Sequence, residues 1–362
     1  MKKLTITFLQ GDGVGPELID AAKKVLTAIE HRFGCDFFYN DMLIGGAAVD
    51  KTGVPLPDET VAACRESDAV LLGAVGGPKW DSLSGHLRPE KGLLSLRAAL
   101  ELYANVRPIV MYNELAACSP LNEQLTKKGV NIMLVREIGG GIYTGERGYR
   151  DGAYGQEAYD TERYSISEIE RIAKLAFEVA RTRNKKIVSV DKANVLETGR
   201  LWRATVTLIG SSYPDVKLEH MLVEDCAALL AKDPSRFDVI LTSNLFGEIL
   251  SDQAATLTGS VGMLPSSSLG LSKVGLYSPI HGPQTELAGK DAANPVGMLL
   301  SAAMMLGQSL DLVEEGAAIE SAVRKALARG YRTPDIAVGK KITQLSCSKM
   351  ADEIVNIILE KK

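Results

Sequence analysis

Short apolar runs alternate with helical patterns through most of this chain, and that alternation restricts the possible folds more than any other feature. The clearest runs are short, rich in leucine or β-branched residues, and bounded by glycine, aspartate or asparagine, as buried strands are. They occupy residues 68–75, 131–137, 186–194 and 237–244. Apolar residues recur at helical spacing over 167–183, 198–211 and 292–309. Strands that alternate with helices predict an α/β fold with a mostly parallel sheet.

A glycine-rich stretch, GDGVGPE at 11–17, follows an apolar run at 4–9 and precedes a helical pattern that begins at Pro16. The context suits a nucleotide-binding turn, but the spacing does not. The dinucleotide fingerprint of the Rossmann fold needs a third glycine three residues after the second, so that the helix can pack closely. Pro16 occupies that position, and proline is favoured in the first turn of a helix. The stretch therefore predicts a sharp turn and a helix start, not a Rossmann site.

Composition and charge narrow the classes of function. The 362 residues carry a formal net charge of −4, which gives no indication of a nucleic-acid partner or an anionic membrane partner. The five cysteines are far apart, odd in number and without a Cys-x-x-Cys pair, which favours a reducing compartment over a disulfide or zinc framework. Apolar runs fall short of a membrane span. We therefore expect a soluble, cytoplasmic protein.

The length of the chain suggests two domains or one large α/β unit. Since no internal repeat or low-complexity linker divides it, we expect a discontinuous two-domain arrangement. Residues 139–165 differ from the rest because they are rich in glycine and tyrosine, with polar residues at alternate positions. They predict a protruding hairpin, and arms of this kind often complete a dimer.

Three arginines occupy places that suit anion recognition. Arg97 lies on a predicted helix, Arg107 precedes a proline, and Arg136 ends a predicted strand. A guanidinium at a strand end, where α/β folds bind their ligands, indicates recognition of a carboxylate or phosphate. For each arginine taken alone, a surface ion pair is the simpler explanation.

Acidic residues in the segment NLFGEILSD are spaced as metal ligands can be. Glu248 and Asp252 lie four residues apart on a predicted helix, so both carboxylates face the same side. A divalent cation would relieve their repulsion, and a solvated acidic face explains them equally well. Glu224 and Asp225 head another predicted helix, where the helix dipole favours anions.

Two further side chains could transfer protons. Lys192 follows Asp191 at the C-terminal end of a predicted strand, where partial desolvation would favour the neutral amine that a general base needs. Tyr143 is flanked by glycines that leave room around its phenol. The alternatives without a function are that Lys192 only increases the solubility of a strand end, and that Tyr143 is an ordinary loop residue. The polar loop 278–295 is long enough to suggest function.

Taken in order, these segments resemble the decarboxylating 2-hydroxyacid dehydrogenases of the isocitrate/isopropylmalate dehydrogenase family. The resemblance runs from about Lys3 to the C-terminal helix. Its motifs, weak singly but strong in fixed order, are GDGVGPE, GAVGGPKW, RPEKGLLSLR, ANVRP, VREIGGGIYTGE, TERYS, VDKANVLE, FGEILSD, GSVGMLPS, and HG followed by AGKDAANP. The resemblance implies two discontinuous α/β domains with a mostly parallel sheet and a dimer-forming arm. The cofactor-binding domain would comprise 1–102 and 256–362, and the substrate and dimerisation domain 103–255, with the arm at 139–165.

The resemblance also implies a reaction and the residues that perform it. We expect NAD-dependent, metal-assisted oxidative decarboxylation of 3-isopropylmalate in leucine biosynthesis, by a homodimer with shared active sites. Tyr143 would donate a proton, and Lys192 of the other subunit would be the general base. The substrate-binding residues would be Glu90, Leu93, Leu94, Arg97, Arg107, Arg136 and Glu224. The cofactor-binding residues would be Val14, Gly76, Gly77, Pro78, His281, Gly282, Glu286, Leu287 and Asn294. The ligands of Mg²⁺ or Mn²⁺ would be Glu224, Glu248 and Asp252.

The sequence departs from the family pattern in three places. Glutamate stands at 224 and 248, where the family usually has aspartate, and the cofactor loop reads HGPQTE in place of HGSAPD. Each such glutamate moves a carboxylate by ~1.5 Å, whereas Mg²⁺ tolerates little change in geometry. Two alternatives therefore stay open. One is a sister enzyme that acts on D-malate, tartrate or another 3-substituted malate, and the other is a low-activity regulatory subunit.

Overall fold

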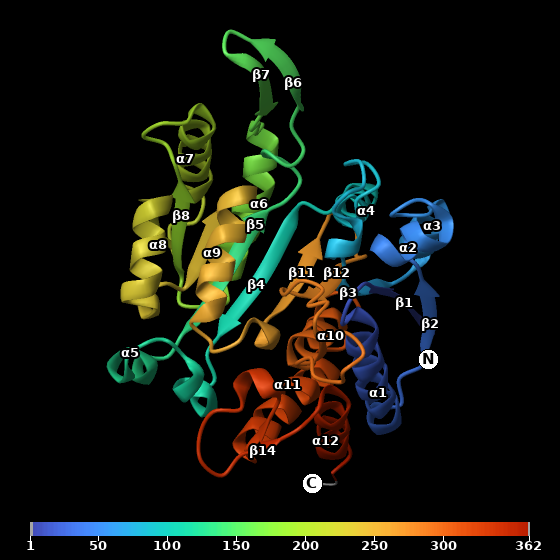
Figure 1. Cartoon of the computed structure of the whole chain (residues 1–362). Helices are drawn as coiled ribbons and strands as arrows, with labels where there is room; N and C mark the ends of the chain where they lie inside the picture. The colour runs from blue at the N-terminus through green and yellow to red at the C-terminus, as the bar shows by residue number, and fades with distance from the viewer. Residues whose placement is uncertain (1–2, 361–362) are drawn as a thin grey trace. The chain divides into compact units, whose positions relative to one another are not determined.

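The computed structural model describes residues 3–360, and the chain divides into two compact units (Figure 1). Unit 1 contains the residues up to Leu102, Tyr112–Pro120, and those from Thr258 onward. Unit 2 contains Tyr103–Met111 and Leu121–Leu257. Tyr112–Pro120 therefore belongs with unit 1, although it lies inside the range 103–255 that the sequence assigns to the second domain. Both units combine helices with a mostly parallel sheet, so the predicted α/β class is confirmed.

The strands of unit 1 follow the order β2 (Phe37–Met42), β1 (Leu4–Gly11), β3 (Ala69–Ala74), β12 (Leu276–Pro279) and β11 (Pro265–Leu269). Neighbours are parallel except β11 and β12, which are antiparallel. The helices of unit 1 are α1 (Gly15–Phe33), α2 (Gly45–Thr52), α3 (Asp58–Glu66), α4 (Pro89–Ala99), α10 (Val296–Gln308), α11 (Val313–Ala328) and α12 (Cys347–Leu359). A short parallel pair joins β13 (Tyr331–Arg332) to β14 (Thr343–Gln344).

The core of unit 1 forms around α10, whose sequence VGMLLSAAMMLGQ is apolar on nearly every side. A helix of that kind is stable only when other elements cover it, and α10 packs against β11, β12 and α11. It begins at Val296, four residues later than the helical pattern suggests. Pro295 precedes the first turn, and the residue before a proline is disfavoured in helical conformation.

The strands of unit 2 follow the order β4 (Ala104–Val110), β5 (Asn131–Glu137), β10 (Val239–Thr242), β8 (Lys186–Asp191) and β9 (Lys217–Leu222). In this order β4 runs antiparallel to β5, and the pairs β5–β10, β10–β8 and β8–β9 are parallel. The helices are α5 (Glu123–Lys128), α6 (Ile166–Arg181), α7 (Glu197–Gly210), α8 (Val223–Lys232) and α9 (Asn244–Thr256). The predicted strands and helices of this region are confirmed to within a few residues at their ends.

The glycine- and tyrosine-rich segment forms an antiparallel hairpin, as predicted, from β6 (Arg147–Gly152) and β7 (Gly155–Asp160). The hairpin extends beyond α6 in Figure 1. Tyr149 and Tyr154 are largely exposed on it. The chain then enters α6 through a capping box in which Ser165 and Glu168 bond each other's backbone N–H groups. A role for this hairpin in dimer formation stays a prediction.

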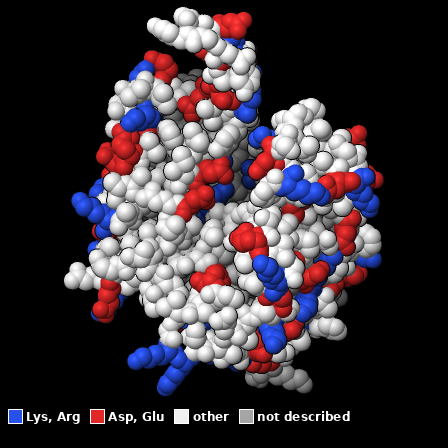
Figure 2. All heavy atoms as spheres, in the orientation of Figure 1, with Lys and Arg blue, Asp and Glu red and all other residues white. Residues whose placement is uncertain are grey.

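On the face shown in Figure 2, lysine and arginine side chains are interspersed with aspartate and glutamate over the described residues. All five cysteines are free thiols. Within residues 3–360, every helix is too short or too polar to cross a membrane.

Candidate active site

Strands β4 and β5 bring two of the predicted arginines to one face of the unit 2 sheet. In their antiparallel register, Asn105 lies opposite Arg136, and Arg107 lies opposite Leu134. Residues that are opposite one another or two apart face the same side, so Asn105, Arg107 and Arg136 share a face. Arg107 and Arg136 are only 6% and 2% exposed. Buried guanidinium groups need polar partners.

Helix α9 supplies the partners of Arg136. Asn244 Oδ1 accepts hydrogen bonds from Arg136 Nε and Nη2 at 3.1 and 2.8 Å. Glu248 Oε2 accepts a further bond from Nη2 at 3.0 Å. Asn244, Glu248 and Asp252 are successively four residues apart and lie along one helix face. The helix can approach because Gly247 has no side chain: a Cβ there would lie 2.6 Å from Arg136 Cγ.

Arg107 is held in a similar way. Its Nε donates to Asn105 Oδ1 at 2.6 Å, and its Nη1 donates to Ser251 Oγ at 2.5 Å. Asp252 Oδ1 lies 3.7 Å from Arg107 Nη1, which makes an ion pair but is too long for a hydrogen bond. The two arginines thus lie beside two carboxylates, Glu248 and Asp252, on the same helix.

Tyr143 reaches this group from the loop between β5 and β6. Its hydroxyl donates to Glu248 Oε2 at 2.9 Å, and its ring lies 6.0 Å from the Arg136 guanidinium. The start of the loop is fixed by Glu137, a fully buried carboxylate that accepts from the N–H groups of Gly139 and Gly140. The structure therefore brings together Arg107, Arg136, Tyr143, Glu248 and Asp252.

The protonation equilibria of this group follow from its surroundings. Burial raises the pKa of the Tyr143 phenol, and the Glu248 charge adds to the increase, so the hydroxyl keeps its proton near neutral pH. Burial alone would raise the pKa of Glu248, but the charge and hydrogen bond of Arg136 outweigh it and lower the pKa. Burial raises the pKa of Asp252, whose charge partner Arg107 is more distant.

The group has unused binding capacity of the kind that a ligand fills. Arg136 Nη1 is buried without a hydrogen-bond partner among residues 3–360. Buried polar groups in native proteins rarely lack a partner. The carboxylates of Glu248 and Asp252 are oxygen donors of the type that Mg²⁺ and Mn²⁺ bind, and Asp252 makes no hydrogen bond to the nearby guanidinium. These residues fit a divalent cation together with an anionic substrate.

Lys192 and Glu224 form a separate pair in unit 2. Lys192 follows the last residue of β8, and Glu224 lies in the first turn of α8; the two side chains form an ion pair. The preceding Asp191 is 2% exposed and binds Arg203 through both carboxylate oxygens. Among the described residues of one chain, Glu224 does not converge with Glu248 and Asp252 as a group of three ligands.

The glycine turn in unit 1 is held by Asp12, which is 4% exposed. The sequence patterns did not predict a role for this residue. Its carboxylate accepts hydrogen bonds from the N–H groups of Gly46, Ala47 and Gly76, each at 2.8 Å. One carboxylate thus joins the turn to the start of α2 and to the segment that carries Gly76, Gly77 and Pro78. A side chain at Gly76 would collide with the Glu90 carboxylate, so Glu90 also lies beside this segment.

The turn also contacts the polar loop that follows β12. Val14 N–H donates to the Pro283 carbonyl at 2.9 Å. Gly13 has a φ of +58°, and a Cβ on it would lie 1.9 Å from the same oxygen. In that loop His281 is buried, which lowers its pKa. At the far end of the loop, Asn294 donates to Asp335 at 2.9 Å. The other predicted residues of the loop, Gly282, Glu286 and Leu287, lie between His281 and Asn294 in the sequence.

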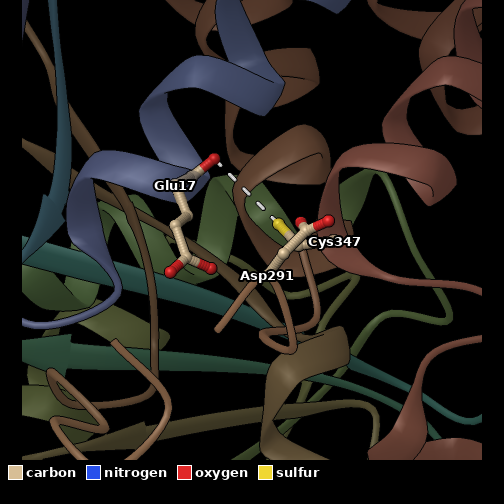
Figure 3. A group of neighbouring side chains, drawn as sticks. All are labelled: Glu17, Asp291 and Cys347. Atoms are coloured by element: carbon tan, nitrogen blue, oxygen red, sulfur yellow. Dashed lines mark hydrogen bonds between the residues drawn. The ribbon is translucent and has the colours of Figure 1, made fainter. Parts of the chain in front are cut away.

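Figure 3 shows a further group in unit 1, formed by Glu17, Asp291 and Cys347. It serves as a structural clip. Asp291 accepts from the N–H and Oγ of Ser348 at the start of α12, and Glu17 accepts from Gly289 N–H. Burial raises the pKa of Cys347 to about 12, so its sulfur stays a neutral thiol. The clip anchors the polar loop to α1 and α12.

A family model described as isocitrate/isopropylmalate dehydrogenase matches residues 5–354. The chain belongs to this family. The 3-isopropylmalate dehydrogenase of Wolinella succinogenes is 52% identical over 361 residues, which cover 100% of this chain and 99% of that protein. The 3-isopropylmalate dehydrogenase of Geobacillus kaustophilus is also 52% identical, with 99% of this chain and 97% of that protein covered.

Solved structures of the isocitrate/isopropylmalate dehydrogenase family share the fold. An isocitrate dehydrogenase from Methylococcus capsulatus aligns with a TM-score of 0.87 at 32% identity, covering 99% of this chain and 100% of that one. A β-decarboxylating dehydrogenase from Thermococcus kodakarensis aligns with a TM-score of 0.77 at 33% identity, covering 98% and 96%. The family resemblance stated from the sequence motifs is confirmed.

Within this family fold, three residues of the unit 2 group were not predicted from the sequence: Asn105, Asn244 and Ser251. Asn244 could have been found by extending the four-residue spacing of Glu248 and Asp252 back by one turn. The residues of α4, namely Leu93, Leu94 and Arg97, are half-buried in unit 1.

Proposed function

We propose that this chain is a 3-isopropylmalate dehydrogenase, which oxidises and decarboxylates 3-isopropylmalate to 4-methyl-2-oxopentanoate and CO₂ with reduction of NAD, in leucine biosynthesis. The observation that carries the proposal is the group formed by Arg107, Arg136, Tyr143, Glu248 and Asp252. Its two arginines can bind a dicarboxylate, its tyrosine holds a phenolic proton, and its two carboxylates can bind a metal ion. Relatives with half of their residues identical carry the name of this activity.

In this proposal the arginines bind the two carboxylates of the substrate. Arg136 offers the buried Nη1 that has no partner within residues 3–360, and a carboxylate there gains a charge-assisted hydrogen bond. Arg107 is held by Asn105 and Ser251 in one orientation, which lowers the entropic cost of binding. Arg97, from α4, is the third arginine that we assign to the substrate.

Two side chains move protons. Lys192, supplied by the second subunit of a homodimer, would take the proton of the C2 hydroxyl, and NAD, when bound, would accept the hydride from C2. Tyr143 then gives its phenolic proton to C3 of the enolate that remains after CO₂ departs, and the hydrogen bond to Glu248 orients that phenol. Glu248, Asp252 and the other subunit's counterpart of Glu224 would hold a divalent cation, Mg²⁺ or Mn²⁺, which would supply positive charge against the negative charge that develops on the substrate oxygen.

Specificity follows from two sets of residues in unit 1. Leu93 and Leu94, with Glu90 beside them on α4, receive the isopropyl group, since apolar side chains gain free energy by covering it. The residues that would contact NAD are Val14, Gly76, Gly77, Pro78, His281, Gly282, Leu287 and Asn294. Glu286 would accept hydrogen bonds from the adenosine ribose hydroxyls, and its charge would disfavour the 2′-phosphate of NADP. Unit 1 is then the cofactor-binding domain, and unit 2 with its hairpin is the substrate and dimerisation domain of a cytoplasmic enzyme.

Steady-state NADH production from a substrate panel tests this proposal. The panel contains 3-isopropylmalate, other 3-alkylmalates, D-malate, tartrate and isocitrate, each with Mg²⁺ or Mn²⁺. We expect the highest kcat/KM for 3-isopropylmalate, and a higher kcat/KM with NAD than with NADP. A preference for D-malate, tartrate or isocitrate would assign the chain to a sister enzyme. Turnover of no member would favour the regulatory-subunit alternative.

A further inference from the structure

We propose that Asn244 is a positioning residue that couples the orientation of Arg136 to the loop that carries Tyr143. The inference deepens the proposed function and rests on it, because it concerns how two residues assigned to that reaction are held. Asn244 does not touch the reacting atoms in this account. It acts through a guanidinium on one side and a backbone carbonyl on the other.

The amide of Asn244 is bonded in both directions. Its Oδ1 accepts from Arg136 Nε and Nη2, and its Nδ2 donates to the carbonyl of Gly140 at 2.9 Å. Its backbone N–H donates to Tyr164 Oη at 2.9 Å. Asn244 is 2% exposed, so water does not replace these partners readily. The side chain of Asn244, the first residue of α9, thus bonds both to Arg136 on β5 and to the loop that follows β5.

The bonds to Arg136 determine which edge of the guanidinium remains for substrate. Asn244 occupies Nε and shares Nη2 with Glu248. Nη1 is then the buried nitrogen that has no partner within residues 3–360. The stem of Arg136 is packed against Gly247, where a Cβ would lie 2.6 Å from Cγ and 2.9 Å from Cβ of the arginine. Because the stem cannot shift and one edge is already bonded, Nη1 is offered in a single orientation.

The bond to Gly140 seats the start of the Tyr143 loop. Gly141 has a φ of +82°, and a Cβ on it would lie 2.4 Å from Tyr164 Oη and 3.2 Å from Asn244 Cβ. The loop therefore lies directly on Asn244 and Tyr164, two residues before Tyr143. Tyr164 is itself fixed by an edge contact with Trp202 at 5.6 Å between ring centroids. Movement at Gly140 would displace the Tyr143 phenol, and a misplacement of about 1 Å can cost about 100-fold in rate.

Asn105 provides the matched control. It accepts from Arg107 Nε at 2.6 Å, as Asn244 accepts from Arg136 Nε, but Arg107 lies on β4 and not on β5, the strand that leads into the Tyr143 loop. Asn105→Ala should therefore raise KM for 3-isopropylmalate and leave kcat within about threefold of wild type. Asn244→Ala should raise KM by about tenfold, the equivalent of one charge-assisted hydrogen bond. It should also lower kcat by about 10- to 100-fold.

A double-mutant cycle separates positioning from general damage. In a Tyr143→Phe background the phenolic proton is already missing, so Asn244→Ala should lower kcat by less than about threefold. An equal fall in kcat in both backgrounds would mean that Asn244 acts independently of Tyr143, and would overturn the inference. Unchanged KM and kcat in Asn244→Ala would overturn it as well.

Amide hydrogen exchange gives a readout that does not depend on activity. Asn244→Ala should speed exchange in the segment 139–144, whereas Asn105→Ala should not. If the wild-type protein turns over no member of the substrate panel, the proposed function fails, and this comparison still decides the inference about the loop. Equal exchange in this segment for wild type and Asn244→Ala would refute the coupling.

Discussion

Replacement of Gly13 by alanine tests whether the glycine turn and the polar loop after β12 form one cofactor site in unit 1. Gly13 has a φ of +58°, where an alanine costs about 1–2 kcal/mol. Its Cβ would lie 1.9 Å from the Pro283 carbonyl oxygen, well inside the 3.0 Å that real Cβ contacts respect. The two loops must therefore separate by at least 3.0 − 1.9 = 1.1 Å.

That separation breaks the hydrogen bond from Val14 N–H to Pro283, which is 2.9 Å long. A lost hydrogen bond costs about 1 kcal/mol net. Together with the cost of placing alanine at a positive φ, the lost hydrogen bond raises the free energy needed to re-form the site on cofactor binding by about 2–3 kcal/mol. The dissociation constant for NADH should then rise by about 30- to 150-fold.

The measurement is the titration of NADH fluorescence with wild type, Gly13→Ala and Gly85→Ala. Gly85 is an exposed glycine with open space around it and no positive φ, so its variant should bind NADH as the wild type does. Circular dichroism should be the same for all three proteins. A correctly folded Gly13→Ala protein whose dissociation constant lies within about threefold of wild type would refute the reasoning.

Three further predictions concern stability, pH and metal. Asp238 is 4% exposed and accepts a hydrogen bond from Arg183 Nε at 2.9 Å, so Asp238→Ala should lower the free energy of unfolding in urea by about 3 kcal/mol. Asp215 forms a surface ion pair with a different arginine, Arg181, so Asp215→Ala should have no measurable effect in the same titration. Burial lowers the pKa of His281 below its ordinary 6.5, so the unfolded chain binds a proton more readily than the folded one, and stability falls as the pH drops below about 6.5. His281→Gln should make this loss of stability smaller when urea titrations at about pH 7.5 and about pH 5.5 are compared. Protein treated with a chelator should lose turnover and recover more of it with Mn²⁺ than with Mg²⁺, because the longer side chain of Glu248 suits the larger ion. Asp252→Asn should abolish this recovery and also the binding of Mn²⁺ measured by electron paramagnetic resonance. Turnover that does not change on addition of chelator would contradict the metal assignment.

The elements of this fold were predictable because their patterns are local. A strand such as β5 is short and mostly apolar, and α10 is apolar on nearly every side, so each is recognisable without its neighbours. The boundary at Val296 was misjudged because Pro295 acts against the apolar periodicity. The antiparallel register of β4 and β5, which brings Asn105 beside Arg136, depends on contacts that are distant in sequence.

Some residues of the site were also predictable from the sequence and others were not. Arg136, Glu248 and Asp252 carry charges at informative positions, and their types alone suggested anion and metal binding. Asn244 and Asp12 are small polar residues whose roles depend on which backbone groups reach them. The Glu17, Asp291 and Cys347 group shows the converse case: three possible ligands converge, but their hydrogen bonds and the neutral thiol make a structural clip.

The stoichiometry of products tests the central proposal most directly. Wild-type protein is incubated with 3-isopropylmalate, NAD and Mn²⁺, and NADH, CO₂ and 4-methyl-2-oxopentanoate are quantified from the same reaction. Our account predicts equal molar amounts of the three products, and none of them from protein in which Arg136 is replaced by alanine. NADH formed without an equal amount of CO₂, or full activity in the Arg136→Ala protein, would contradict it.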